Sequence, residues 1–137
     1  MMLSIQMPEN LPIILSIYSD YGITALRFAL GLVLVAHGWP KISDIKGTAT
    51  WLGPAGFRPA LFWASVIAVI EFVGGVLLLV GVFVRVVSLF VALQFIVIMV
   101  WRLKNRDSFI GKLELDVLVL AAALALLTLG GGAWSVL

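Results

Sequence analysis

Residues 61–82 read LFWASVIAVIEFVGGVLLLVGV, and this run decides the fold class of the chain. An apolar stretch of this length can cross a bilayer as a helix, which takes about 20 residues. Glu71 lies at its centre. A carboxylate at that depth costs roughly 2.5–3.5 kcal/mol even on the most lenient insertion scale, so it should face a partner or a polar cavity. Two interpretations of Glu71 stay open: a functional group, or a buried acid or ion pair that only orients the helices.

The composition of the whole chain is that of an integral membrane protein. Of its 137 residues, 63% are hydrophobic and 12% are charged, and the mean hydropathy is +1.19. Soluble domains carry charges at about a quarter of their positions. The length suits one domain with one core. The net charge of +2 comes from few charges. The chain has no basic stripe with interleaved aromatic residues, so nucleic-acid binding is not predicted.

The cysteine and histidine counts narrow the chemistry. The chain has no cysteine, which excludes thiol nucleophiles, iron–sulfur clusters and thiolate metal sites built from its own residues. Its one histidine, His37, cannot pair with a second to hold a b-type haem. The clustered histidines and carboxylates of a zinc or di-iron centre are also lacking. We therefore expect no metal and no self-contained catalytic site.

Four apolar segments predict an all-α fold, a transmembrane four-helix antiparallel bundle. They cover about residues 22–37, 61–82, 84–101 and 113–129, each near the length needed to span a bilayer. The second and third are joined only by Gly81–Arg85, which predicts a tight helical hairpin. The first loop, residues 38–60, is rich in glycine and proline. Within it, Thr48–Leu52 predicts a short interfacial helix with Trp51 at head-group level.

Residues 1–20 form a predicted N-terminal interfacial leader before the transmembrane domain of residues 21–137. Its apolar piece, Leu11–Tyr18, is too short to span, so we expect it to lie along the membrane surface. Met1–Gln6 carries no basic region, and no cleavage-site pattern follows, so we expect no cleavable signal peptide.

Lysine and arginine gather in the first and third loops. The residues concerned are Lys41, Lys46, Arg58, Arg102, Lys104, Arg106 and Lys112. The other side carries Arg85 and, inside the first span, Arg27. The positive-inside rule therefore predicts that both loops are cytoplasmic and that both termini lie outside.

Arg27 is the predicted partner of Glu71. Antiparallel spans with a rise of about 1.5 Å per residue place the two within about one helical turn in depth, within reach of an arginine side chain. Such a pair would keep Glu71 ionised. Gln94, midway along the third span, reaches a similar depth and is expected to hydrogen-bond into the same site, as a contact between helices before any ligand contact.

A second polar group is expected near the inner face of the membrane. It comprises His37, Lys41, Arg102, Glu114 and Asp116. We expect His37 to donate to Asp116 or Glu114, an arrangement suited to proton exchange. The alternative is a charged rim whose long side chains reach water.

Gly74 and Gly75 lie one turn after Glu71. Small residues let neighbouring helices approach closely, and this is the preferred interpretation. The alternative is room for a flat ligand beside the carboxylate.

The order and spacing of these motifs resemble the DoxX family of small membrane proteins. The resemblance rests on Arg27-Phe-Ala-Leu-Gly31, His37-Gly38-Trp-Pro-Lys41, Glu71-Phe-Val-Gly74-Gly75, Gly81, Arg85, Glu114 and the closing Gly130-Gly-Gly132-Ala-Trp134-Ser135. It covers nearly the whole chain from Asp20 onward. It implies a four-helix, multi-pass protein of a bacterial-type cytoplasmic (inner) membrane.

The resemblance implies no single chemistry. The family includes a membrane subunit of a thiosulfate:quinone oxidoreductase and partners of superoxide dismutase and sulfurtransferase in oxidative-stress complexes. We expect an accessory or assembly subunit of a larger membrane-associated complex, bound to other membrane or cytoplasmic proteins, and a homo-oligomer stays open. The first alternative is a redox-linked component that binds a quinone-like cofactor around Arg27 and Glu71, and the second is a small transporter. The candidate site residues are Arg27, His37, Lys41, Glu71, Arg85, Gln94, Glu114 and Asp116.

Overall fold

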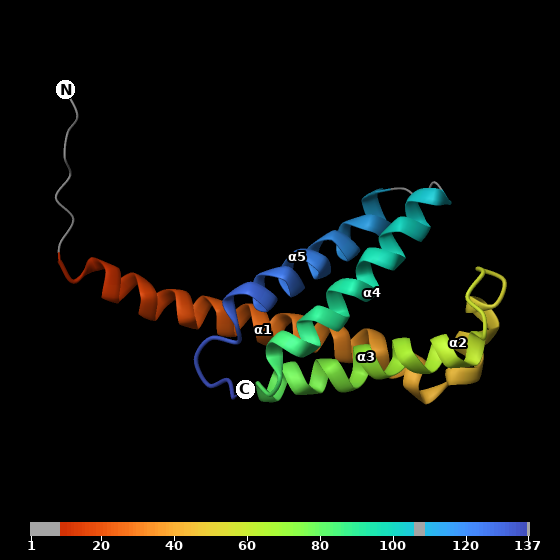
Figure 1. Cartoon of the computed structure of the whole chain (residues 1–137), viewed down its shortest axis with the longest axis horizontal. Coiled ribbons are helices and arrows are strands. Elements are labelled where there is room, and N and C mark those ends of the chain that lie inside the picture. Colours follow the sequence, from red (N-terminus) through yellow and green to blue (C-terminus); the bar gives the residue numbers. More distant parts are fainter. Residues whose placement is uncertain (1–8, 106–108, 137) are drawn as a thin grey trace, which may run out of the picture.

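The computed structural model describes residues 9–105 and 109–136. Its elements are α1 (Leu11–Ser43), α2 (Ile45–Leu52), α3 (Ala60–Val80), α4 (Val84–Lys104), the kinked turn η1 (Phe109–Leu113) and α5 (Glu114–Leu129) (Figure 1). The described residues form helices and contain no β-strand, so the predicted all-α class is confirmed.

Three of the described helices, α1, α3 and α4, are long and apolar enough to cross a membrane. α5 has 16 residues, which give about 24 Å at a rise of about 1.5 Å per residue. A full hydrocarbon core takes about 20 residues. The fourth predicted segment is therefore a helix at the expected place, and its crossing of the bilayer stays a prediction.

The long helices associate in two pairs. α1 packs along α3, and α4 packs along α5. The two pairs diverge from the end where α3 turns into α4 (Figure 1). That turn needs only the residues between Val80 and Val84, because Gly81 and Phe83 adopt left-handed backbone angles, with φ of 87° and 52°. The predicted tight hairpin is confirmed.

Small residues bring α1 and α3 into backbone contact. A methyl group added at Gly31 would lie 3.0 Å from the carbonyl oxygen of Gly75, and one added at Gly38 would lie 2.5 Å from the backbone nitrogen of Phe72. Gly74 faces the other way, toward Val87 of α4. The close packing predicted for Gly74 and Gly75 is confirmed, and these contacts fix which residues of α1 and α3 lie side by side.

The core lies where the two helix pairs meet. Its fully buried side chains come from all four long helices and include Leu34, Leu78, Val91, Ala123 and Leu126. Large apolar side chains on the outer faces of the same helices are exposed, as expected where lipid replaces water.

α1 is longer than the first predicted span. The prediction ended it at His37, yet the helix continues through Pro40 to Ser43 and therefore carries Lys41. At its other end, Leu11–Tyr18 is continuous with the span and extends beyond the other helices (Figure 1). The predicted place of this segment on the membrane surface stays a prediction, and residues 1–8 of the leader lie outside the described residues.

The short helix predicted in the first loop is confirmed and begins earlier than expected, at Ile45. Asp44 caps it, since its carboxylate accepts a hydrogen bond of 3.0 Å from the backbone nitrogen of Gly47. The exposed Trp51 lies edge-on to Trp101 of α4, with ring centres 5.9 Å apart.

Candidate functional site

Glu71 is held by side chains from two other helices. It is 1% exposed in the middle of α3. Both of its carboxylate oxygens accept from Nζ of Lys41 in α1, each at 2.7 Å. Oε1 also accepts from Nε2 of Gln94 in α4 at 2.7 Å. Charge-assisted hydrogen bonds of this length are among the stronger polar contacts in proteins, so one carboxylate ties α1, α3 and α4 together.

The predicted ion pair between Arg27 and Glu71 is wrong. Gly38 is the α1 residue that packs against the backbone of Glu71, and Arg27 lies about 16 Å before it along the helix. The prediction counted the depth of Arg27 from an outer end of the first span near Gly22, whereas α1 begins at Leu11, so its register against α3 was misplaced. With the observed register, Lys41, one turn after Gly38, reaches the carboxylate. The predicted contact from Gln94 is confirmed.

Lys41 connects this buried acid to the protein surface. Its side chain is 33% exposed, whereas that of Glu71 is 1% exposed. The ammonium group therefore neutralises the carboxylate from the end of the molecule where the first loop begins.

Gln94 has unused hydrogen-bonding capacity. The residue is 9% exposed, and its buried Oε1 has no hydrogen-bond partner among the described residues. The amide must turn its Nε2 toward Glu71, because a carboxylate only accepts, so Oε1 faces away from the acid. A buried acceptor of this kind is where a water or the donor group of a ligand would bind.

A second ion pair links the adjoining ends of α4 and α5. Nε of Arg102 lies 2.8 Å from Oδ2 of Asp116, which is 5% exposed as a residue. Of the polar group expected at this end, Arg102 thus lies within ion-pair distance of Asp116, whereas Lys41 pairs with Glu71.

The predicted hydrogen bond from His37 is not formed in the described part of the chain. Its side chain is exposed, and Asp116 pairs with Arg102 instead. Glu114 accepts from the backbone nitrogen of Gly111 at 3.0 Å, which stabilises the turn before α5.

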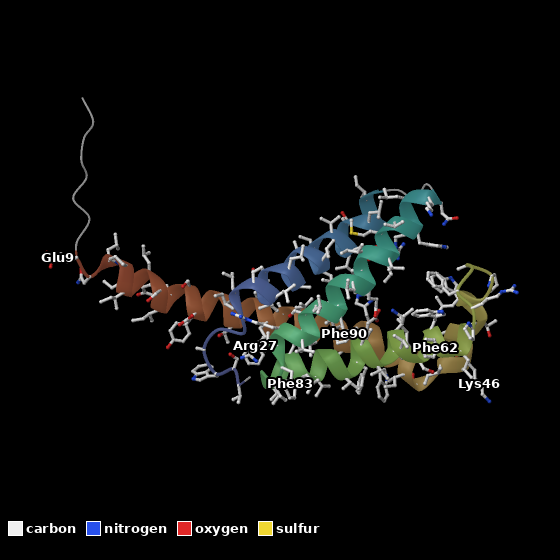
Figure 2. The ribbon with its side chains drawn as sticks, in the orientation of Figure 1. Glu9, Arg27, Lys46, Phe62, Phe83 and Phe90 are labelled. Atoms are coloured by element: carbon white, nitrogen blue, oxygen red, sulfur yellow. The ribbon has the colours of Figure 1, made fainter. Side chains whose placement is uncertain are left out.

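Arg27 forms a separate buried centre at the opposite end of the helices. It is 1% exposed and donates to the carbonyl oxygens of Leu78 at 2.8 Å and Gly131 at 3.0 Å. Thr24 donates to the carbonyl of Ala133 at 3.0 Å. Arg27 therefore fastens the C-terminal segment, residues 130–136, to α1 and to the end of α3 (Figure 2). Sequence reasoning missed these acceptors because backbone carbonyls carry no side-chain signal.

Arg85 lies apart from the Glu71 site. It is exposed in the first turn of α4 and borders a polar depression next to the C-terminal segment. Within the described ranges, no group of three or more histidine and acidic side chains is placed to hold a metal ion.

An apolar groove of about 500 Å³ runs between α3 and α4. Ile70 and Gly74, which flank Glu71 in α3, line it, and Phe90 lies one turn before Gln94 on the α4 side. Phe62 and Phe90 mark two points along the groove in Figure 2. The groove therefore runs along the part of α3 that carries Glu71, but Glu71, Lys41 and Gln94 are not among the residues that line it.

Comparison with known proteins gives one family and one curated relative. The sequence model of the DoxX family matches residues 22–103. A protein of Bacillus subtilis (strain 168), named "Putative oxidoreductase CatD", is 34% identical over 111 residues, which cover 81% of this chain and 81% of the relative. No solved structure matches the chain significantly.

Proposed function

Since this chain belongs to the DoxX family of membrane proteins, we propose that it is an accessory subunit of a larger membrane-associated oxidoreductase complex. The proposal rests on one observation: both carboxylate oxygens of Glu71 already accept hydrogen bonds within the protein. Lys41 and Gln94 already occupy both of its oxygens. A carboxylate held in this way sets the register of three helices and gives a partner a rigid surface, whereas a general acid or base needs an open side facing its substrate.

The counts of cysteine and histidine also support the role of an accessory subunit. The relative's name assigns it to the oxidoreductases, and electron transfer needs a carrier. With no cysteine and one histidine in the whole sequence, the chain cannot supply thiolates for a cluster or two ligands for a haem. In a redox complex the carrier would belong to a partner subunit or be a bound organic molecule.

Two surfaces are available to partners. Apolar side chains along the outer face of α4, including Val86, Leu93 and Val97, are between 43% and 52% exposed and would pack against lipid or a membrane subunit. Lys46, Arg58 and Lys104 are exposed at the end that holds the first and third loops. We propose that this end is cytoplasmic, in a bacterial-type inner membrane with both termini outside, and that it docks a cytoplasmic partner.

A second candidate function is the binding of a quinone-like molecule. Two observations favour it: the unpartnered Oε1 of Gln94 and an apolar groove between the two helices that carry Glu71 and Gln94. A quinol hydroxyl would donate to Oε1, and an apolar tail would lie between α3 and α4. Lys41 and Glu71 would then hold a proton near the head group.

Mild-detergent purification from the organism that encodes the chain separates the two functions. We expect the tagged protein to elute with other subunits in a fixed ratio, and that ratio should fall for Glu71→Gln more than for Gln94→Ala. Extraction of bound lipophilic molecules gives the second readout. A monomeric chain with one quinone per protein would replace the assembly function by the quinone-binding function.

A further inference from the structure

The C-terminal segment forms one wall of a polar depression of about 320 Å³. The residues around it include Asp20 of α1, Arg85 at the start of α4, and Gly130 and Gly132 of the segment itself. α4 begins at Val84 and α5 ends at Leu129. If α4 and α5 cross the bilayer as the sequence predicts, their ends, and with them this depression, lie at the level of the lipid head groups.

The wall of the depression is held firmly. Arg27 binds the carbonyl of Gly131, and the backbone nitrogen of Val136 donates to the carbonyl of Gly81 at 2.7 Å. Gly130 and Gly132 have φ of 84° and 72°, backbone angles that favour glycine. A methyl group at Gly130 would lie 3.4 Å from Nε of Arg85, an ordinary contact distance, so this part of the segment lies directly beside the guanidinium group.

The depression contains two opposite charges that do not pair with each other. Arg85 and Asp20 both line it and both are exposed. Within residues 9–105 and 109–136, neither forms an ion pair within 4.0 Å. A cationic and an anionic group are thus free to meet two opposite charges of one ligand. Arginine recognises phosphate oxygens well because its planar group donates two parallel hydrogen bonds.

Aromatic residues beside the depression fit the same level of the membrane. Trp134, between Gly132 and Ser135, is 75% exposed, and its ring lies edge-on to Tyr21 with ring centres 6.2 Å apart. Tryptophan and tyrosine gather where the bilayer meets water.

We propose that this depression binds the head group of a membrane phospholipid that carries both a phosphate and a primary ammonium group, such as phosphatidylethanolamine. Arg85 binds the phosphate and Asp20 binds the ammonium group. Phosphatidylglycerol offers the phosphate without the ammonium group and is the matched comparison. The proposal is independent of the Glu71 site and of any partner subunit.

The test uses the full chain in nanodiscs made of equal amounts of phosphatidylethanolamine and phosphatidylglycerol. Native mass spectrometry measures the lipid that stays bound after release. We expect one phosphatidylethanolamine per chain, enriched several-fold over phosphatidylglycerol. Arg85→Gln should lower retention of both lipids about tenfold, as expected for a charged hydrogen bond. Asp20→Asn should remove the preference and keep the retention of phosphatidylglycerol. Arg58→Gln, an exposed arginine of the first loop, is the control and should change neither.

Equal retention of the two lipids by the unmodified chain would overturn the proposal, whatever the variants do. The proposal would also be overturned if Arg85→Gln and Arg58→Gln retained the same amount of lipid. Soluble glycerophosphoethanolamine provides a further arm: if it binds in detergent while no lipid is retained in nanodiscs, the ligand is a free phosphate ester and the assignment to a lipid is wrong.

Discussion

Replacing Lys41 by methionine should destabilise the protein because it removes the counter-charge of the buried Glu71 carboxylate, which must then stay unpaired or take up a proton at a cost in free energy. Breaking a buried ion pair by removing one partner costs about 3–5 kcal/mol. Because the Lys41 side chain is 33% exposed and water screens part of the pair, we expect the lower end, about 3 kcal/mol. For a chain of this size the loss corresponds to a fall in Tm of roughly 10 °C.

A double-mutant cycle measures the coupling itself. Lys41→Met and Glu71→Gln are made singly and together, and unfolding is followed in detergent by circular dichroism. The double variant should lose less stability than the two single variants combined, since neither charge is left alone. Lys46→Met is the control, because Lys46 is exposed on α2 (Figure 2). Strictly additive losses from Lys41→Met and Glu71→Gln would refute the ion pair.

Three further predictions test other parts of the structure. Arg27→Lys should cost about 2 kcal/mol and speed up carboxypeptidase digestion of residues 130–136, since one ammonium cannot replace the fork that binds the carbonyls of Leu78 and Gly131; an unchanged digestion rate would contradict this. Gly38→Val should lower Tm strongly, because the Cβ atom of the valine would lie 2.5 Å from the backbone nitrogen of Phe72. Gly22→Ala is the control: a Cβ atom at Gly22 has no other atom within 4 Å, so this variant should leave Tm unchanged or raise it. Gln94→Leu should cost about 1 kcal/mol, less than Lys41→Met, because it removes one hydrogen bond and also an unpaired buried oxygen; a loss as large as that of Lys41→Met would show that Gln94 carries the site.

Glu71 and its setting could be predicted from the sequence because the signal is local. A charged residue inside an apolar run predicts a buried polar site. The short connection around Gly81 predicts that α3 and α4 form a helical hairpin. The contact between Gln94 and Glu71 could be predicted from the similar depth of the two residues along that hairpin, because the short turn fixes the register of α4 against α3.

The partner of Glu71 could not be predicted in the same way. The register of α1 against α3 depends on where backbones touch, at Gly31, Gly38 and Gly75, and apolar sequence does not encode it. Helix ends are also poorly marked, so the extension of α1 through Pro40 went unseen. Arg27 shows a further limit, since its acceptors are carbonyl groups that any residue would provide.

Infrared difference spectroscopy of the unmodified chain against Glu71→Gln at neutral pH tests the ion pair between Lys41 and Glu71 most directly. Labelling the glutamate carboxyl carbon with ¹³C separates the signal of Glu71 from those of the aspartates. The ion pair predicts that Glu71→Gln removes carboxylate stretching bands, and that Lys41→Met turns those bands into the carbonyl band of a protonated acid. Loss of a protonated-acid band from the unmodified chain would show that Glu71 is neutral and would contradict the ion pair.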